Sequence, residues 1–199
     1  MFSGNELVLR LIELYRNIDS TYAGAAEKIG LVCEGCDGAK CCTVDLTLHT
    51  FMEIFYLRRG LNTLEPAKRL EILGRCQSMI EAKKEAPYSD RYRNAVCAVN
   101  TEGACMLYEY RPMICRLAGI PHFITRPDGS KVESGGCERL QKNFPISDLK
   151  IDRTEFYQEM ARMEVEAVRA RGKRTKKLTV AEALASEFPD GEFSVYEII

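Results

Sequence analysis

Residues 33–42 read CEGCDGAKCC and place four cysteines within ten positions. The run opens a stretch that ends at Cys137 and holds all nine cysteines of the 199-residue chain. Its glycines permit tight backbone turns, so we expect a ligand loop here rather than a helix. Clustered thiols in a chain without a secretory signal indicate metal or iron–sulfur ligation more than disulfides.

The composition places this run in an ordinary globular chain. Hydrophobic residues make up 46% and charged residues 29%, and the net charge of -1 predicts no general attraction to nucleic acid or to a membrane surface. The first residues lack the pattern of a signal peptide, and no apolar run reaches the roughly 20 residues of a membrane span. We therefore expect a cytoplasmic protein with reduced thiols, and an extracellular disulfide-bonded domain is the weakest alternative.

An amphipathic helix is predicted at about residues 4–29, before the cysteine run. Apolar residues recur there at spacings of three and four, which gives one apolar face, and Gly30 ends the pattern. The apolar positions are Leu7, Leu11, Leu14, Ile18, Tyr22, Ala25 and Ile29. The loop of cysteines is therefore expected to leave the end of a packed helix.

Two further helices are predicted after the cysteine run. The first is expected over Thr47–Arg59, with Asp45 or Thr47 as its cap and Gly60 as its end. The second is expected over Pro66–Lys84, because proline is favoured in the first turn of a helix. Together they form an αα-hairpin that returns the chain toward the cysteine run.

Turn residues predict two small β hairpins in the next part of the chain. Residues 95–99 and 104–108 flank the turn-like residues 100–103, and residues 122–125 and 130–133 flank a Pro-Asp-Gly turn. Alternation along the first hairpin predicts that Tyr108 and Tyr110 pack against the cysteines from a half-buried strand. A short helical turn is expected from Pro112 to Leu117.

The C-terminal part is predicted to be helical at about residues 152–188. Asp152 with Glu155, and Thr179 with Glu182, have the spacing of capping boxes. The apolar stripe of the first of these helices is Phe156, Met160, Met163 and Ala167, and Pro189 ends the second helix. The predicted fold is mainly α with small β hairpins: one compact domain over residues 1–199, organised around a cysteine-ligated metal centre whose core is residues 31–137.

Eight cysteines are candidate metal ligands: Cys33, Cys36, Cys41, Cys42, Cys97, Cys105, Cys115 and Cys137. Cys33-x-x-Cys36 is a chelating spacing. The adjacent pair that follows has diverging side chains, so its members serve different metal ions or different irons, or one of them does not ligate. The first four and the last four are far apart in sequence. Because the adjacent pair diverges and the αα-hairpin returns the chain near its start, we expect the two groups to meet in at least one shared centre.

The segment around Cys115 has features that suit a thiolate. Pro112 starts a helical turn there, whose exposed N–H groups can stabilise a negative sulfur. Arg111 and Arg116 can offset the charge of a thiolate-rich cluster, with an ordinary surface ion pair as the alternative. Cys137 follows a Gly-Gly pair, which permits a tight approach of the backbone to a site.

The other chemically active residues have simpler explanations. Cys76 lies on the apolar stripe of its helix, so we expect a small buried hydrophobe. His49, in the first turn of the second helix, and His122 could each supply a ligand or a proton, but a lone histidine is more often a surface or hydrogen-bonded residue. The basic residues 169–177 are expected to form a solvated loop, with an RNA or acidic-partner patch as the alternative.

The two cysteine segments together resemble the YkgJ-like cysteine-cluster family, described as zinc- or iron-chelating domains. The first is the CxxC…CC run, and the second, Cys105–Arg116, reads CMLYEYRPMICR and matches the family pattern C-x-[ILV]-Y-x-x-R-P-x-x-C-R. The resemblance covers about residues 31–137, although the gap between Cys36 and Cys41 is longer than in many members. It implies chelation of zinc or iron by the eight cysteines.

Metal binding through clustered thiolates is thus the expected function. The expected cofactor is zinc or iron, and a [4Fe–4S] cluster is one form that the iron could take. The alternative is an iron–sulfur enzyme, because such a cluster needs four cysteines and can leave one iron open to a substrate. A similar cysteine run occurs in flagellin lysine methylase, which suggests methyl transfer or redox chemistry by resemblance. Nucleic acid and membrane are not expected partners, and enzyme status stays open.

Overall fold

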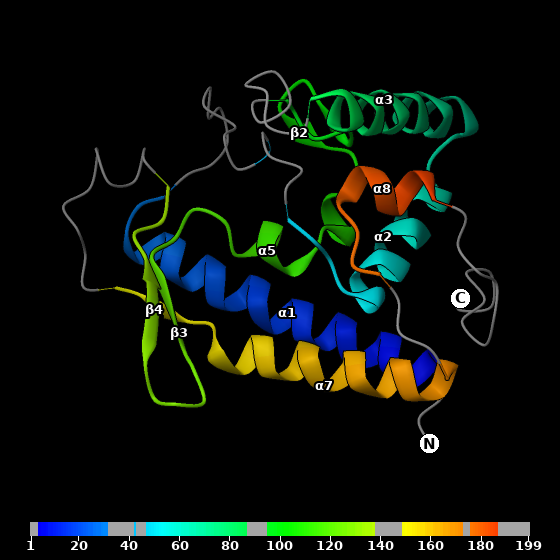
Figure 1. Ribbon diagram of the computed structural model, residues 1–199. Helices are drawn as coiled ribbons and strands as arrows, with labels where there is room; N and C mark the ends of the chain where they lie inside the picture. The colour runs from blue at the N-terminus through cyan, green and yellow to red at the C-terminus, as the bar shows by residue number, and fades with distance from the viewer. Residues whose placement is uncertain are drawn as a thin grey trace.

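The described chain is mainly helical with small sheets, as the apolar spacing predicted (Figure 1). The structure, a computed structural model, describes residues 4–31, 42, 47–86, 95–137, 149–172 and 176–186. Its longer helices are α1 (Gly4–Lys28), α2 (Phe51–Thr63), α3 (Pro66–Glu85) and α7 (Thr154–Arg171). The bounds of α1 and α3 agree with the predicted helices within one or two residues.

Helices α1 and α7 lie side by side and share a hydrophobic core with α2 (Figure 1). The buried residues of α1 and α7 include Leu7, Leu11, Leu14, Ile18, Met160, Met163 and Ala167, as their spacing predicted. Burying each large aliphatic side chain contributes roughly 1.5–3 kcal/mol. Arg10 of α1 pairs with Glu159 and Glu166 of α7 at 2.6 Å each, which fastens the edge of this interface.

A second layer consists of α3 and the short helix α8 (Val180–Ala185), which packs on both α2 and α3 (Figure 1). Thr179 and Glu182 form the predicted capping box at the start of α8. Cys76 of α3 is fully buried in the apolar cluster between these helices. The prediction that Cys76 is a core residue is therefore confirmed.

Helix α2 begins and ends later than predicted. Its cap is Thr50, whose side chain accepts from the Glu53 amide while the Glu53 carboxylate accepts from the Thr50 amide. This reciprocal pair fixes the start at Phe51 instead of Thr47. The helix also continues past Gly60, where a Cβ would lie 2.3 Å from Cγ of Tyr110. Gly60 therefore permits close packing and does not end the helix.

The first predicted hairpin is present but much shorter. Strands β1 (Asn100–Thr101) and β2 (Ala104–Cys105) pair antiparallel. Glu102 and Gly103 form the two-residue turn, with φ of 52° and 86°. A two-residue turn with positive φ at both positions matches the twist of the flanking strands. The turn therefore needs only Glu102 and Gly103, and Asn100 and Thr101, which were predicted to lie in the turn, belong to β1.

The segment after β2 is helical, so the prediction of a half-buried strand at Tyr108 and Tyr110 was wrong. Residues Tyr108–Tyr110 form the 3₁₀ helix η2, in which Tyr108 is 58% exposed and Tyr110 packs on the ring of Tyr56. The predicted helical turn follows as α5 (Met113–Arg116), with Pro112 as its N-cap. The chain between Cys105 and Cys115 is therefore two short helical turns.

The second predicted hairpin is confirmed. Strands β3 (His122–Thr125) and β4 (Lys131–Ser134) pair antiparallel over the predicted residues. Strand β5 (Ile151–Asp152) adds to β3 in parallel, which completes a three-stranded sheet with the order β4-β3-β5. This sheet lies at one end of the α1–α7 pair (Figure 1).

Two expectations for the C-terminal part need correction. Helix α7 begins at Thr154 without the expected capping box, because Oδ1 of Asp152 accepts from the Thr154 amide at 2.9 Å. The first part of the basic stretch is helical rather than loop, since α7 continues to Arg171 and ends at Gly172. The Arg171 guanidinium lies 4.0 Å from the centre of the Phe51 ring.

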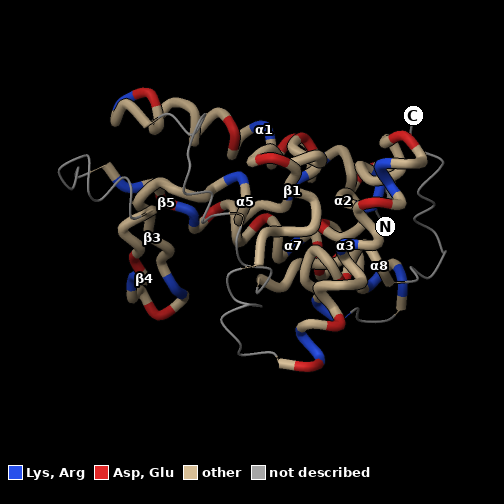
Figure 2. The backbone as a smooth tube through the Cα atoms, turned by 90° about the horizontal axis from the view of Figure 1, so that it is seen from above, with Lys and Arg blue, Asp and Glu red and all other residues tan. Residues whose placement is uncertain are grey.

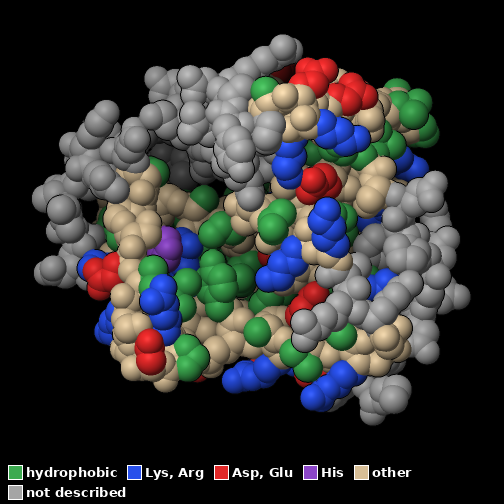
Figure 3. Space-filling view, viewed as in Figure 1, with side chains coloured by type: hydrophobic (Ala, Val, Ile, Leu, Met, Phe, Trp, Pro, Cys, Tyr) green, Lys and Arg blue, Asp and Glu red, His purple; other side chains and the backbone are tan. Residues whose placement is uncertain are grey.

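Charge is mixed over the surface of the described residues. Acidic and basic residues are interspersed along α1, α3 and the β3–β4 hairpin (Figure 2). On the face in Figure 3, hydrophobic side chains gather in the middle, and lysines and arginines are scattered beside them. Among the described helices, none is both long and apolar enough to cross a membrane.

Candidate metal centre

The β1–β2 hairpin, η2 and α5 bring Cys105 and Cys115 together. Cys105 ends β2, and α5 carries Cys115. Both residues have free thiols. Burial raises the pKa of the Cys115 thiol, and the negative charge of an ionised Cys105 raises it further.

Cys42, the last cysteine of the run at residues 33–42, lies near this pair. Its carbonyl oxygen accepts a hydrogen bond from the Cys97 amide at 2.6 Å. Its thiol raises the pKa of both Cys105 and Cys115. The structure thus brings one cysteine of the first group to the second group, whereas Cys33, Cys36 and Cys41 lie outside the described residues.

Two thiols of this cluster, those of Cys105 and Cys115, resist ionisation without a metal. Desolvation raises the pKa of Cys105, with Cys42 adding to the effect. Desolvation, and then the charges of Cys105, Cys42 and Glu53, raise the pKa of Cys115 to about 12. Cys115 is nevertheless exposed as a residue, so an ion from solvent can reach it although protein groups surround its sulfur. A cation that offsets the negative charges would remove the main obstacle to ionisation.

The amides of α5 do not stabilise the Cys115 thiolate as expected. The Met113 amide donates to Oε1 of Glu53 at 3.0 Å, and the Cys115 amide donates to the Pro112 carbonyl at 3.0 Å. Glu53 occupies the position at the start of α5 that a thiolate was expected to use. Its carboxylate charge raises the pKa of Cys115 instead of lowering it.

Two groups do favour ionised sulfur in this cluster. The backbone amide of Leu107 hydrogen-bonds to Cys105 and lowers the pKa of its thiol. Arg111 lowers the pKa of both Cys105 and Cys115 through its positive charge. Amide N–H groups and nearby cations are the usual outer support of thiolate ligands.

The two predicted arginines share a carboxylate on α1. Arg111 pairs with Oδ1 of Asp19 at 3.2 Å, and Nη1 of Arg116 pairs with Oδ2 of the same residue. Arg116 is 4% exposed and also donates to the carbonyl oxygens of Arg111, at 2.9 Å, and Glu109. Both arginines therefore form ion pairs with Asp19, and the charge of Arg111 also lowers the pKa of Cys105 and Cys115.

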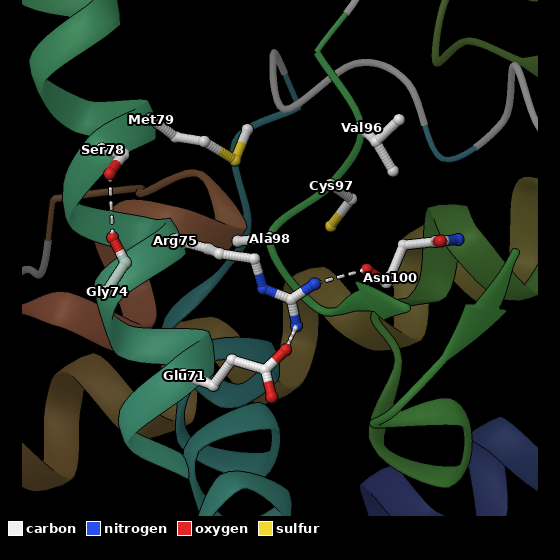
Figure 4. A pocket seen from close by; sticks show the side chains of 9 residues that line it. All are labelled: Glu71, Gly74, Arg75, Ser78, Met79, Val96, Cys97, Ala98 and Asn100. Carbon is white, nitrogen blue, oxygen red and sulfur yellow. Dashed lines mark hydrogen bonds and ion pairs between the residues drawn. The ribbon is translucent and has the colours of Figure 1, made fainter. Parts of the chain in front are cut away.

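Cys97 lies on the wall of a pocket of about 460 Å³ between α3 and β1 (Figure 4). Arg75 of α3 crosses this pocket and donates to the Asn100 carbonyl at 2.8 Å and to Oγ1 of Thr101 at 3.1 Å. Glu71 pairs with Arg75 at 3.8 Å. The pocket residues thus fasten the strand that follows Cys97 to α3.

Cys137 is fixed to the chain that leaves α5. Its amide donates to the Gly119 carbonyl at 2.9 Å. The preceding Gly136 has φ of 79°, and a Cβ on it would lie 2.4 Å from the same oxygen. Gly136 therefore makes a close approach to the backbone at Gly119, whereas the approach to a metal site stays a prediction.

The two histidines have local partners. His49 is not in α2, where it was expected, because its backbone pairs with Leu178 in an isolated β-bridge before the helix. It is 2% exposed, its Nδ1 lies 4.0 Å from Oε2 of Glu53, and burial lowers its pKa. His122 lies on β3 with Nδ1 3.2 Å from the Ile120 carbonyl, and its pKa is lowered by burial and by Arg153.

The described donors do not form a metal site by themselves. In the part of the chain that the structure describes, no three His, Cys, Asp or Glu side chains are arranged to hold one ion. The chemistry of the set fits a soft metal, because several thiols meet beside an N–H donor and a guanidinium. A metal at this cluster would need Cys42, Cys105 and Cys115 to rearrange, or some of them to combine with ligands from the other predicted cysteines.

Sequence reasoning missed two residues of this site, Glu53 and Asp19. The spacing of Thr50 and Glu53 is that of a capping box, so the start of α2 at Thr50 was readable from the sequence. Its contact with Met113, sixty residues away, was not. Asp19 lies one turn after Tyr15 on α1 and has no motif that could have revealed its role.

Comparison of the chain with protein-family models, with curated proteins and with solved structures found no match. The class that the fold and the site define is a mainly α protein with a cluster of cysteine thiols. What this cluster does must be argued from its own residues.

Proposed function

We propose that this chain binds a thiophilic metal, zinc or iron, through clustered cysteine thiolates. The observation that carries the proposal is the contact between the two cysteine groups: the Cys97 amide donates to the Cys42 carbonyl at 2.6 Å. Cys105 and Cys115 are near enough for the charge of Cys42 to raise the pKa of both thiols. If these thiols ionise, their charges repel one another, and a bound cation would offset that repulsion. This agrees with the resemblance to the YkgJ-like family, which implies chelation of zinc or iron.

The donor set suits zinc or iron better than a hard ion. Thiolate is a soft ligand that selects zinc, copper(I) or iron–sulfur clusters over magnesium or calcium. Metal must displace the thiol protons, and the Leu107 amide and Arg111 assist by favouring ionised sulfur. When bound, the metal would cross-link the loop that precedes α2 to the hairpin and to α5.

The described part of the chain also supports a shared centre instead of two separate modules. Cys42 belongs to the CxxC…CC run, and its backbone already contacts Cys97 of the second group. Ligands from both groups, with Cys33, Cys36, Cys41 and Cys137 as further candidates, would make metal part of the folding energy. Removal of the metal should then loosen the whole fold rather than one end.

The test is the metal content of protein purified with and without oxygen. We expect at least about one zinc or iron per chain by elemental analysis, held through removal of loosely bound metal. An absorbance spectrum under anaerobic conditions separates the two metals, because iron–sulfur clusters absorb visible light and zinc–thiolate sites are colourless. Protein with less than about one metal per chain under both conditions would refute the proposal.

A further inference from the structure

A cavity of about 460 Å³ lies between α3 and β1 (Figure 4). Its volume is within the usual range of pockets that hold small molecules. Cys42, Cys105 and Cys115 are not among the described residues that line it, so its ligand is a separate question from the metal. The residues that bear on its ligand are Glu71, Gly74, Arg75, Met79, Val96 and Ala98.

The Arg75 side chain extends from α3 across this cavity and retains unused donors (Figure 4). Nη1 donates to the Asn100 carbonyl at 2.8 Å, and Nη2 donates to Oγ1 of Thr101 at 3.1 Å. A guanidinium has five N–H groups, and Nε of Arg75 is buried without a hydrogen-bond partner. Because an unsatisfied buried donor is costly, an acceptor that engages this guanidinium would stabilise the site.

The charged residues of α3 around the cavity leave Arg75 without a close carboxylate. Glu71 lies 3.8 Å from Nη2 of Arg75, which is too long for a hydrogen bond, and it accepts a hydrogen bond from Lys68 at 3.1 Å. Among the described residues, no other carboxylate pairs with Arg75. Two cations and one carboxylate leave one net positive charge, which suits a ligand with a single negative charge.

The rest of the cavity wall is largely apolar. Met79 and Ala98 are buried there, and Val96 is 52% exposed at the same cavity. A ligand with an apolar part would remove this surface from water, which is favourable. An inorganic anion such as phosphate would leave the apolar wall uncovered.

Gly74 leaves space at the cavity wall. It lies in the middle of α3, where glycine is less favourable than alanine. Its φ is not in the left-handed region, and a Cβ added to it would meet no atom within 4 Å. Neither the backbone nor the packing of α3 therefore requires glycine here, whereas a side chain would reduce the space for a ligand.

We propose that this cavity binds a small carboxylic acid with an apolar chain. The carboxylate accepts from the remaining N–H groups of Arg75, and the chain lies against Met79 and Ala98. Pairs of arginine with carboxylate are strong because charge assists the hydrogen bonds, and their geometry makes them specific. The inference goes beyond metal binding, and neither proposal depends on the other.

The test is a titration of the isotope-labelled full-length protein, followed by the amide shifts in NMR spectra. The probes are hexanoate, which has a carboxylate and an apolar chain, and hexanamide, which has the same chain without the charge. We expect hexanoate to bind with a Kd of roughly 1 mM and hexanamide at least about tenfold more weakly. The shifts should centre on the amides of α3 and β1 around the cavity.

Arg75→Gln should weaken hexanoate binding about tenfold and leave hexanamide binding nearly unchanged, because it removes the charged partner. Arg126→Gln is the matched control, since Arg126 is exposed between β3 and β4 and does not line the cavity. Equal affinity for the two probes, or unchanged hexanoate binding in Arg75→Gln, would overturn the inference. Inorganic phosphate bound as tightly as hexanoate would also overturn it, as would no hexanoate binding at about 20 mM.

A second variant tests the cavity without removing the arginine that fastens β1 to α3. Gly74→Leu adds a side chain at the cavity wall and should weaken hexanoate binding at least about fivefold, because interiors tolerate little overlap. Gly24→Leu is its control, since Gly24 is in α1 and its added Cβ would also meet no atom within 4 Å. If Arg75→Gln does not fold, this pair decides the matter. Equal hexanoate binding by the two variants would show that the ligand does not occupy this cavity, and would overturn the inference.

Discussion

Cys76 and Cys115 lie in two regions that use the same side chain for opposite purposes. Cys76 is fully buried in α3, in an apolar cluster that includes Ile72, Leu107 and Leu184. Cys115 reaches the surface among other thiols, a carboxylate and a guanidinium. In the first region the thiol acts as a small hydrophobe. In the second, burial and then the charges of neighbouring groups decide how readily the thiol ionises.

The sequence around each cysteine already distinguishes the two environments. Cys76 repeats with the apolar residues of its helix, whereas Cys115 stands between two arginines after a proline. The neighbours that raise the pKa of Cys115 come from three other segments, so they were invisible in the local sequence. Four substitutions can break or sharpen this comparison.

The largest effect is expected from Cys115→Ser. Serine cannot replace a thiolate as a ligand of a soft metal, so zinc or iron content should fall well below one per chain. At a free zinc concentration of roughly 100 times Kd, loss of binding removes about 2.7 kcal/mol from the free energy of unfolding. Urea unfolding with and without zinc measures this loss.

Cys105→Ser is the matched variant for this experiment, because Cys105 is a neighbouring thiol in the same cluster. Both variants should resemble wild type when zinc is absent, and both should lose the stabilisation by zinc. A Cys115→Ser protein that keeps its full metal content would show that this thiol is not a ligand.

The second effect concerns the contact between α2 and η2. Gly60→Ala should lower the free energy of unfolding by about 1–3 kcal/mol, because the new Cβ would lie 2.3 Å from Cγ of Tyr110. Tyr110 belongs to the segment that joins Cys105 to Cys115, so zinc binding should weaken as well. Urea unfolding and zinc competition measure the two effects.

Gly74→Ala provides the control for this substitution. Gly74 is also in a helix, but its added Cβ would have no atom within 4 Å. There alanine should stabilise the helix by roughly 0.5–1 kcal/mol through its better propensity. Similar gains in both variants would mean that Tyr110 moves aside without cost.

Much of the fold could be predicted because it follows from local patterns. The apolar face of α1, the proline at the start of α3 and the capping box at Thr179 each lie within one element. The β3–β4 hairpin is specified by its Pro-Asp-Gly turn in the same way. These features need no knowledge of distant contacts.

One error was local, because the capping box of Thr50 and Glu53 was readable from the sequence and was overlooked. The other errors lie where a distant residue decides. Gly60 was predicted to end the helix, but it lies within α2. The Tyr110 side chain occupies the space that a side chain at position 60 would need. For the site, the meeting of Cys42 with the second group was predicted, whereas Glu53 and Asp19 become visible only in three dimensions.

The third effect concerns Cys76, the cysteine in the apolar cluster. Cys76→Ala should leave the metal content unchanged and lower the free energy of unfolding by about 1 kcal/mol, because it truncates one small buried side chain. Elemental analysis and urea unfolding measure the two quantities. Metal loss equal to that of Cys115→Ser would show that the sorting of the cysteines is wrong.

The smallest effect concerns protons near the thiol cluster. His49 contacts Glu53, which acts on Cys115, and burial lowers the pKa of His49 below its ordinary value of 6.5. Between the lowered pKa and about 6.5, the unfolded chain binds more protons at this site than the folded chain. The free energy of unfolding should therefore fall as the pH drops below about 6.5, by less than the roughly 1.4 kcal/mol per pH unit that one proton allows.

His49→Gln should flatten this decline, because glutamine does not titrate and can still hydrogen-bond. Urea unfolding at a series of pH values from about 7 down to about 5 measures the slope for each variant. His122→Gln is the comparison, since the pKa of His122 is also lowered but its side chain is only half-buried on β3. It should flatten the slope less than His49→Gln does. A slope that His49→Gln leaves unchanged would mean that His49 accepts a proton in the folded protein as readily as in the unfolded chain, with Glu53 offsetting the burial.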